Sequence, residues 1–220
     1  MKPHEGLIVV LPEHFNKRDI PALLRRHEAW IRKTAALFDA QRLEPSFQSA
    51  SELPSTVLFS HCSAEWKIEY RHEERLEVAL QVLSPDTLLL SGDVANVALC
   101  RKLLCLWLKQ RAQQLLIPQF EQLATALGFS YGKATVRLQH SRWGSYSSSG
   151  VITLNTKLLF LPAHLVRHVM VHELCHTVHQ NHSRAFWGLV QQHDPLWRLN
   201  NSDMKSAWKY VPAWVSRQTA

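Results

Sequence analysis

The chain has 220 residues, of which 46% are hydrophobic and 20% are charged, and its 25 Lys and Arg residues outnumber its 18 Asp and Glu residues. This composition excludes an intrinsically disordered chain, and the length suffices for a sizeable core in one large domain or two small ones. The net charge of +7 is compatible with nucleic acid, nucleotides or acidic proteins as partners, but it is equally common in ordinary soluble enzymes.

The first part of the chain is predicted to contain one helix and a small antiparallel sheet. An apolar run at 7–11 favours a strand, and Asp19 followed by Pro21 favours a helix that begins there and ends near Phe38. Residues 39–54 mix Gln, Ser and Pro and indicate a linker. Apolar runs, some alternating with polar residues, then predict four strands at 56–59, 66–70, 76–83 and 87–90.

A long helix is predicted to follow this sheet. It begins at Ser91-Gly92-Asp93 and runs to Leu116. Pro118 is expected to break or kink it, because proline removes a backbone donor and its ring clashes with the preceding turn. A second helical piece then ends at Gly128.

Two strands and three further helices are predicted beyond that point. The strands lie at 134–138 and 151–155, with a Ser- and Gly-rich loop at 141–150 between them. Pro162 favours the start of a helix that ends near Gln180 and Asn181. Shorter helices are predicted at 183–193 and 202–210.

One short motif carries the chemistry of the chain. His172, Glu173 and His176 form an H-E-x-x-H motif, and His182 follows six residues later. Side chains four residues apart share a helix face, so His172 and His176 can bind one metal ion together. Glu173 then lies beside the ion, where it can take a proton from a metal-activated water. Catalytic zinc needs a third protein ligand and an open position, and His182 is expected to supply that ligand.

The residues around the motif leave two candidates for the third metal ligand. The offsets of zero, four and ten match the metzincin pattern, although His179 stands where that pattern has Gly. His179 is an alternative to His182 as the third ligand, and Asn181 is expected to turn the chain in a left-handed conformation. His164 and His168 are expected to leave the metal-binding face, because each step of four residues drifts by about 40° around a helix.

Segments on both sides of the motif resemble a known family. They are Ser141-Arg142-Trp143-Gly144-Ser145, Leu154-Asn155, His172–His182 and Ser183-Arg184-Ala185-Phe186-Trp187. Together they resemble the YgjP-like metallopeptidases (the DUF45 group), which are gluzincin-related, M48-like zinc proteins of bacteria. The order of elements extends this resemblance over most of the chain. The resemblance implies that His172, His176 and His182 bind zinc and that Glu173 is the general base.

The chain also departs from its relatives. The family's Arg-Trp-Gly-Ser segment usually continues with Cys, whereas this chain has Tyr146, so a thiol has no role there. We expect Arg142 to be able to bind a carboxylate or phosphate and Trp143 to be able to wall the pocket. The favoured alternative is that Trp143 fills the core and Gly144 makes a turn. Tyr146 and Tyr210 are further candidates, as donors to a developing oxyanion.

The predicted fold class is α+β. Residues 1–90 are expected to form the strand, helix and small antiparallel sheet, and 91–220 a helix-rich, zincin-like metallopeptidase domain. The four cysteines form no C-x-x-C pair, no signal peptide is recognised, and the most apolar stretches carry charges or histidines. We therefore expect free thiols, a cytoplasmic location and no membrane-spanning helix.

The predicted function is that of a cytosolic zinc metallopeptidase with one zinc ion per chain and a peptide or protein substrate. One alternative is a metal-dependent nucleotide pyrophosphatase, with which the basic charge and Arg142 are compatible. Another is a DNA-associated protein. The resemblance implies distant kinship to SprT-like proteases that act on DNA-bound proteins, but this chain lacks the C-x-x-C pairs of their zinc ribbon. A DNA-binding module with a structural zinc is the non-enzymatic form of this alternative.

Overall fold

The computed structural model describes residues 15–32 and 53–216, together with Leu7, Val9, Leu11, Ala35 and Ala36. Contacts divide the chain into two units. Leu53–Val211 form the larger unit, and Met1–Glu52 with Pro212–Ala220 form the smaller one. The domain boundary expected at residue 90 stays a prediction.

The smaller unit contains the helix predicted after Asp19. A 3-10 turn, η1 (Lys17–Asp19), leads directly into α1 (Ile20–Arg26), which has Pro21 in its first turn. The side chain of Asp19 makes no capping hydrogen bond, so proline and the preceding turn set the start of the helix. The predicted helix end near Phe38, and most of the strand at 7–11 and of the linker at 39–54, lie outside the described residues. The unit also includes α7 (Ala213–Ser216).

All four predicted strands of the first sheet are present, but their pairing is mixed. They are β1 (Thr56–Phe59), β2 (Ala64–His72), β3 (Val78–Ser84) and β4 (Thr87–Gly92), in the order β1-β2-β4-β3. The prediction of an all-antiparallel sheet is wrong, because β2 and β4 pair in parallel. Strand β4 is buried on both faces from Leu88 onward. A strand that is apolar on both faces belongs in the middle of a sheet, so β4 lies between β2 and its own hairpin partner β3.

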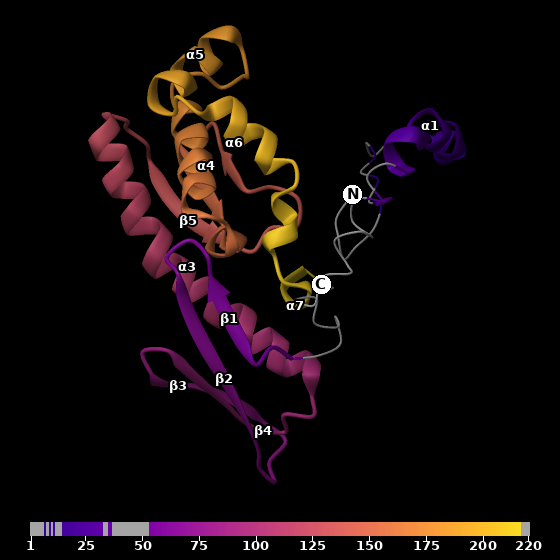
Figure 1. Ribbon diagram of the computed structural model, residues 1–220, viewed down its shortest axis with the longest axis vertical. Helices are drawn as coiled ribbons and strands as arrows, with labels where there is room; N and C mark the ends of the chain where they lie inside the picture. The colour runs from indigo at the N-terminus through magenta and orange to yellow at the C-terminus, as the bar shows by residue number, and fades with distance from the viewer. Residues whose placement is uncertain are drawn as a thin grey trace. The chain divides into compact units, whose positions relative to one another are not determined.

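The long helix α3 (Val97–Leu127) connects the two sheets of the larger unit (Figure 1). It begins later than predicted, because Ser91 and Gly92 belong to β4 and the side chain of Asn96 caps the helix by accepting from Leu99 N (3.1 Å). The predicted break at Pro118 is wrong, and the helix is continuous to Gly128. Pro118 is exposed, whereas Leu116, Ile117 and Phe120 around it are buried, so tertiary packing outweighs the local cost of about 3 kcal/mol.

A cluster of aromatic rings joins the first sheet to the elements that lead to the metal motif. Trp107 of α3 stacks on Phe59 of β1 (ring centroids 5.6 Å apart) and meets the edge of Trp66 of β2 (5.2 Å). Phe59 in turn contacts Phe160, at the end of the 3-10 helix η2 (Thr156–Phe160). This packing fixes the segment from which the motif helix begins.

The second sheet has the order β5-β7-β6 and contains a strand that was not predicted. The elements after α3 are β5 (Lys133–Arg137), β6 (Gly144–Tyr146), β7 (Val151–Asn155), α4 (Ala163–Cys175), α5 (Arg184–His193), α6 (Trp197–Met204) and η3 (Ala207–Tyr210). Strand β6 lies in the Ser- and Gly-rich segment expected to be a loop, and α4 packs against both β6 and β7. The helix predicted at 183–193 is confirmed, whereas that at 202–210 is replaced by the end of α6 and by η3.

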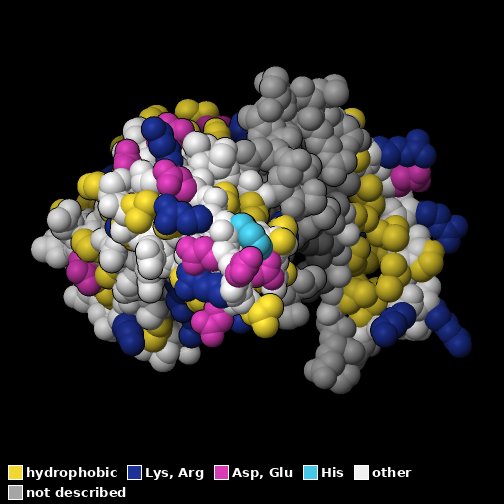
Figure 2. Space-filling model, turned by 90° about the horizontal axis from the view of Figure 1, so that it is seen from below, with side chains coloured by type: hydrophobic (Ala, Val, Ile, Leu, Met, Phe, Trp, Pro, Cys, Tyr) yellow, Lys and Arg dark blue, Asp and Glu magenta, His cyan; other side chains and the backbone are white. Residues whose placement is uncertain are grey.

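The fold is therefore α+β, as predicted. All four cysteines are free, and no described helix has the length and apolar character needed to cross a bilayer. On the face drawn in Figure 2, acidic and basic side chains lie intermixed.

Candidate metal centre

The motif helix α4 starts directly after Pro162 as expected, but it ends at Cys175 rather than near Gln180. His172 and Glu173 occupy its last turn, and His176 is the C-cap. The chain then turns, and His179 N donates to Cys175 O (3.0 Å). The left-handed conformation expected at Asn181 is wrong, since among the described non-glycine residues only Ser63 has a positive φ.

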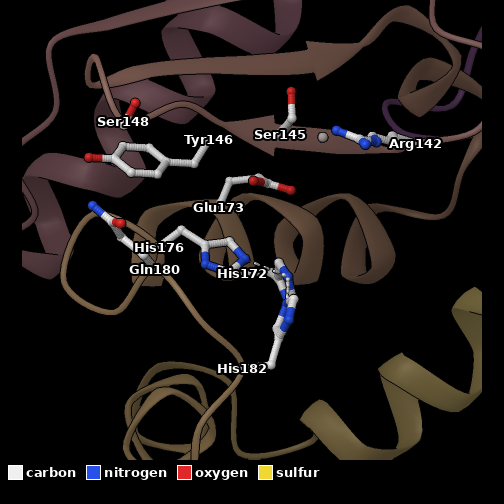
Figure 3. A pocket seen from close by; sticks show the side chains of 10 residues that line it. Arg142, Ser145, Tyr146, Ser148, His172, Glu173, His176, Gln180 and His182 are labelled. Carbon is white, nitrogen blue, oxygen red and sulfur yellow. Dashed lines mark hydrogen bonds between the residues drawn. The ribbon is translucent and has the colours of Figure 1, made fainter. Parts of the chain in front are cut away.

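Three histidine rings converge beyond this turn (Figure 3). The Nε2 atom of His172 lies 3.2 Å from that of His176 and 3.1 Å from that of His182. Ligand atoms at about 2.0–2.1 Å from a tetrahedral ion lie about 3.3 Å apart. Both distances match those expected around one shared ion, and within the described part of the chain these three histidines form the group of His, Cys, Asp or Glu side chains that could hold a metal.

His179 contacts the histidine cluster through its backbone carbonyl rather than through its ring. The Nδ1–H of His176 donates to the His179 carbonyl (3.1 Å), which leaves the Nε2 lone pair of His176 free for a metal. The cluster of donor atoms includes His182 and not His179. Of the two candidates for the third ligand, His182 is the one whose ring lies in the group that could hold a metal ion.

Aromatic side chains of α5 form the floor beneath the three rings. Phe186 is fully buried, stacks on His176 (4.6 Å) and contacts the rings of His172 and His182 edge-on (5.0 and 4.9 Å). Trp187 stacks on His182 (5.7 Å). Phe186 also packs on Val171 and Cys175 of α4. The metal-binding rings are thus held on one side by a packed hydrophobic cluster.

Glu173 lies between these histidines and strand β6 (Figure 3). Its side chain is buried, and its Oε2 has no hydrogen-bond partner among the described residues. Strand β6 passes so close that a Cβ atom on Gly144 would lie 2.6 Å from Glu173 Oε1 and 2.7 Å from its Cγ. Gly144 is therefore part of a strand, not of the predicted turn, and only a residue without a side chain fits there.

The segment before β6 is held by a buried asparagine. Asn155, at the end of β7, donates through Nδ2 to the carbonyls of Gln139 (3.0 Å) and Arg142 (2.5 Å). Trp143 stacks on Trp208 of η3 (4.1 Å) and is only partly buried, so the favoured expectation that it fills the core is wrong. This scaffold holds Arg142 at the edge of the site.

A cleft of about 380 Å³ opens beside the three histidines. It is lined by Arg142, Gly144, Ser145, Tyr146, Ser148, His172, Glu173, His176, Gln180 and His182. Arg142 and Tyr146 are therefore brought to the site, whereas Tyr210 is exposed on η3 and does not line the cleft. Ser145, Ser148 and Gln180 were missed, because single polar residues in loops or short strands have no spacing that marks them.

Comparison with protein-family models gives a match over most of the chain. The model of the YgjP-like, metallopeptidase domain family matches residues 1–207. The chain belongs to this family. Comparisons with the curated proteins and with the solved structures found no match. As a member of the YgjP-like family, the chain is a metal-dependent hydrolase of the metallopeptidase type, and the three converging histidines are where its metal fits.

Burial shifts the pKa values of both the histidines and the glutamate in this YgjP-like site. Burial, with added repulsion from His176, His182 and His168, lowers the pKa of His172 to about 3, so its ring is neutral and able to bind a metal at physiological pH. Burial also lowers the pKa of His176. The pKa of Glu173 is raised to about 8 by burial, and the positive charge of Arg142 acts in the opposite direction. A bound cation would return this carboxyl to its ionised form.

These pKa shifts predict proton release on metal binding. At pH 7 the metal-free protein holds a proton on Glu173 but none on His172, and a nearby dication favours the carboxylate. Zinc binding at pH 7 should release about one more proton from the wild type than from Glu173→Gln. Calorimetric titrations in two buffers of different ionisation enthalpy measure this difference. Equal proton release from both proteins would contradict the assignment.

Gly144→Ala should impair the site without removing the metal. The new methyl group meets the Glu173 carboxyl, not the histidines, so the carboxyl must move. A misplacement of about 1 Å can cost about 100-fold in rate, and we expect a loss of at least this size with one metal ion still bound. Gly188→Ala is the matched control, because a Cβ at Gly188 of α5 meets nothing within 4 Å. Wild-type activity in Gly144→Ala would show that the close contact is not needed.

Proposed function

We propose that this chain is a zinc-dependent peptidase in which His172, His176 and His182 hold one zinc ion and Glu173 is the general base. The observation that carries the proposal is the meeting of three histidines, whose ligand nitrogens all lie within 4.8 Å of one another, beside a buried carboxyl whose Oε2 has no hydrogen-bond partner among the described residues. Membership of a metallopeptidase family supports peptide bonds as the target.

The donor set favours zinc in a catalytic site. Imidazole nitrogens suit zinc, and three protein ligands are typical of sites that keep a fourth position for water or substrate, whereas structural sites have four. When bound, zinc would supply a Lewis acid and would lower the pKa of a water molecule to about 7. The open cleft on this side of the histidines supports the catalytic type.

Protein side chains transfer the proton and orient the substrate. The Oε2 atom of Glu173 makes no other hydrogen bond among the described residues, so it is available to accept a proton from the attacking water and to pass it to the leaving amine. Burial of this carboxyl strengthens its electrostatic interactions, because little water screens them. Arg142 and Tyr146 lie at opposite ends of the cleft in Figure 3, where they are placed to orient the substrate.

Nucleotide pyrophosphatase activity is the second candidate, and the position of Arg142 on the cleft favours it, since guanidinium groups bind phosphate. A DNA-binding module with a structural zinc has less support. Such a site is usually closed by four ligands, whereas three histidines converge here.

One experiment separates these functions. Zinc-loaded wild type and Glu173→Gln are each incubated with a mixed peptide library and with nucleoside triphosphates. We expect new amino termini in the peptide library with the wild type only, detected by mass spectrometry. Pyrophosphate release without peptide cleavage would instead favour the second candidate, and no turnover of either substrate would contradict both.

A further inference from the structure

A second cavity lies next to the metal cleft and shares part of its wall. It has a volume of about 280 Å³, and Arg142, Gly144, His172 and Glu173 line both spaces. Pockets for whole small molecules usually measure about 300–1,000 Å³. The second cavity is therefore of a size to take one side chain of a larger substrate that lies across Glu173.

A rigid hydrogen-bonded network presents His168 to this cavity. The ring is 3% exposed, and its Nδ1–H donates to Asp194 Oδ2 (2.6 Å). The Nδ2 group of Asn200 donates to both oxygens of Asp194 (3.1 and 3.0 Å). Because Nδ1 is bonded to Asp194, only Nε2 is left for another partner, and within the described part of the chain it makes no hydrogen bond. His168 is one of the residues that line the cavity.

The rest of the lining has an apolar side formed by Trp143, Val169 and Met204, and Ser141 and Asn201 add polar side chains to it. Trp143 is held by its stack on Trp208, with a centroid distance of 4.1 Å and an interplanar angle of 26°. Val169 of α4 and Met204 of α6 complete the apolar part of the lining. An aromatic ring can pack against this apolar side, and methionine adapts to the edge of the ring.

We propose that this cavity is a specificity subsite that takes a tyrosine side chain of the peptide substrate, next to the scissile bond. The phenol ring packs against Trp143, Val169 and Met204, and its hydroxyl bonds to Nε2 of His168. A hydroxyl both donates and accepts, so it satisfies Nε2 whether or not that atom carries a proton. Phenylalanine fills the same space but leaves Nε2 without a partner. The proposal rests on the proposed peptidase function.

The test uses short peptides that are identical except for Tyr, Phe or Leu at one position, which is moved along the sequence. Binding to zinc-loaded Glu173→Gln is measured by fluorescence anisotropy, and kcat/KM is measured for the wild type. At one position we expect Tyr to be preferred over Phe by about tenfold in both readouts, because Phe cannot make the hydrogen bond to His168 Nε2. In the His168→Leu background this ratio should fall to about one.

Loss of His168 leaves Asp194 buried without its partner, so this variant can misfold. Met204→Trp is the second variant, since it fills the cavity from α6 and leaves the His168 network intact. It should weaken the binding and cleavage of Tyr and Phe peptides alike.

The possible outcomes test the tyrosine subsite and the peptidase function separately. Peptide cleavage with no preference between Tyr and Phe would overturn the subsite and leave the peptidase standing. Tyr-selective binding without cleavage would support the subsite and overturn the peptidase. Unselective binding without cleavage would overturn both.

Discussion

Replacing Glu173 with glutamine is expected to lower kcat by about 100- to 10,000-fold while the protein still binds one metal ion. Glutamine keeps the shape of the side chain but cannot take a proton from water. The Oε2 atom has no hydrogen-bond partner among the described residues, so the substitution breaks no contact there. The measurement is kcat and KM on a peptide identified by the library screen, with metal content determined on the same sample.

The metal-free proteins provide an independent readout. Because the pKa of Glu173 is raised to about 8 in the folded protein, its folded state holds a proton that the unfolded state loses above about pH 4.5. The metal-free wild type should therefore lose stability relative to Glu173→Gln as the pH rises from about 4.5 to 8. Denaturant titrations across this range measure the difference. A constant difference, together with wild-type kcat in the variant, would remove Glu173 from the mechanism.

His182→Ala should have the second large effect, a loss of metal affinity of more than about 100-fold. Even the outer partners of metal ligands commonly contribute about 10- to 100-fold in affinity, and a ligand contributes more. His182 is exposed in the segment just before α5, so alanine there leaves no buried cavity. Competition with a coloured chelator measures the affinity.

His179→Ala is the matched control for this variant. His179 lies in the same turn, but it serves His176 through its backbone carbonyl, which alanine retains. We expect metal affinity within a few-fold of the wild type. If instead His179→Ala loses the metal and His182→Ala keeps it, the third ligand has been assigned to the wrong residue.

The centre of the site was predictable because its spacing is local. Residues four apart share a face of any helix, whatever the surrounding fold, so the pairing of His172 with His176 can be predicted from the sequence. The same periodicity places Glu173 beside them. The third ligand was harder, since the turn after Cys175 decides between His179 and His182. That turn is set by backbone hydrogen bonds that leave no mark in the sequence. The early helix end was missed for the same reason.

The structural features that were not predicted depend on contacts between segments far apart in the sequence. Strand β6 has three residues in a Ser- and Gly-rich stretch, and it is a strand only because β7 pairs with it. The role of Gly144 depends on Glu173, 29 positions away, and that of His168 depends on Asp194. The parallel pairing of β2 with β4 likewise follows from the burial of β4, not from any local pattern.

X-ray absorption spectroscopy of the zinc-loaded protein tests the central claim most directly. The claim is that three histidines hold one ion and leave a position open beside Glu173. We expect one zinc ion per chain, with three imidazole nitrogens and at least one non-histidine oxygen at about 2.0–2.2 Å. A fourth imidazole, a sulfur ligand, or a protein that binds no zinc at equimolar concentration would contradict it.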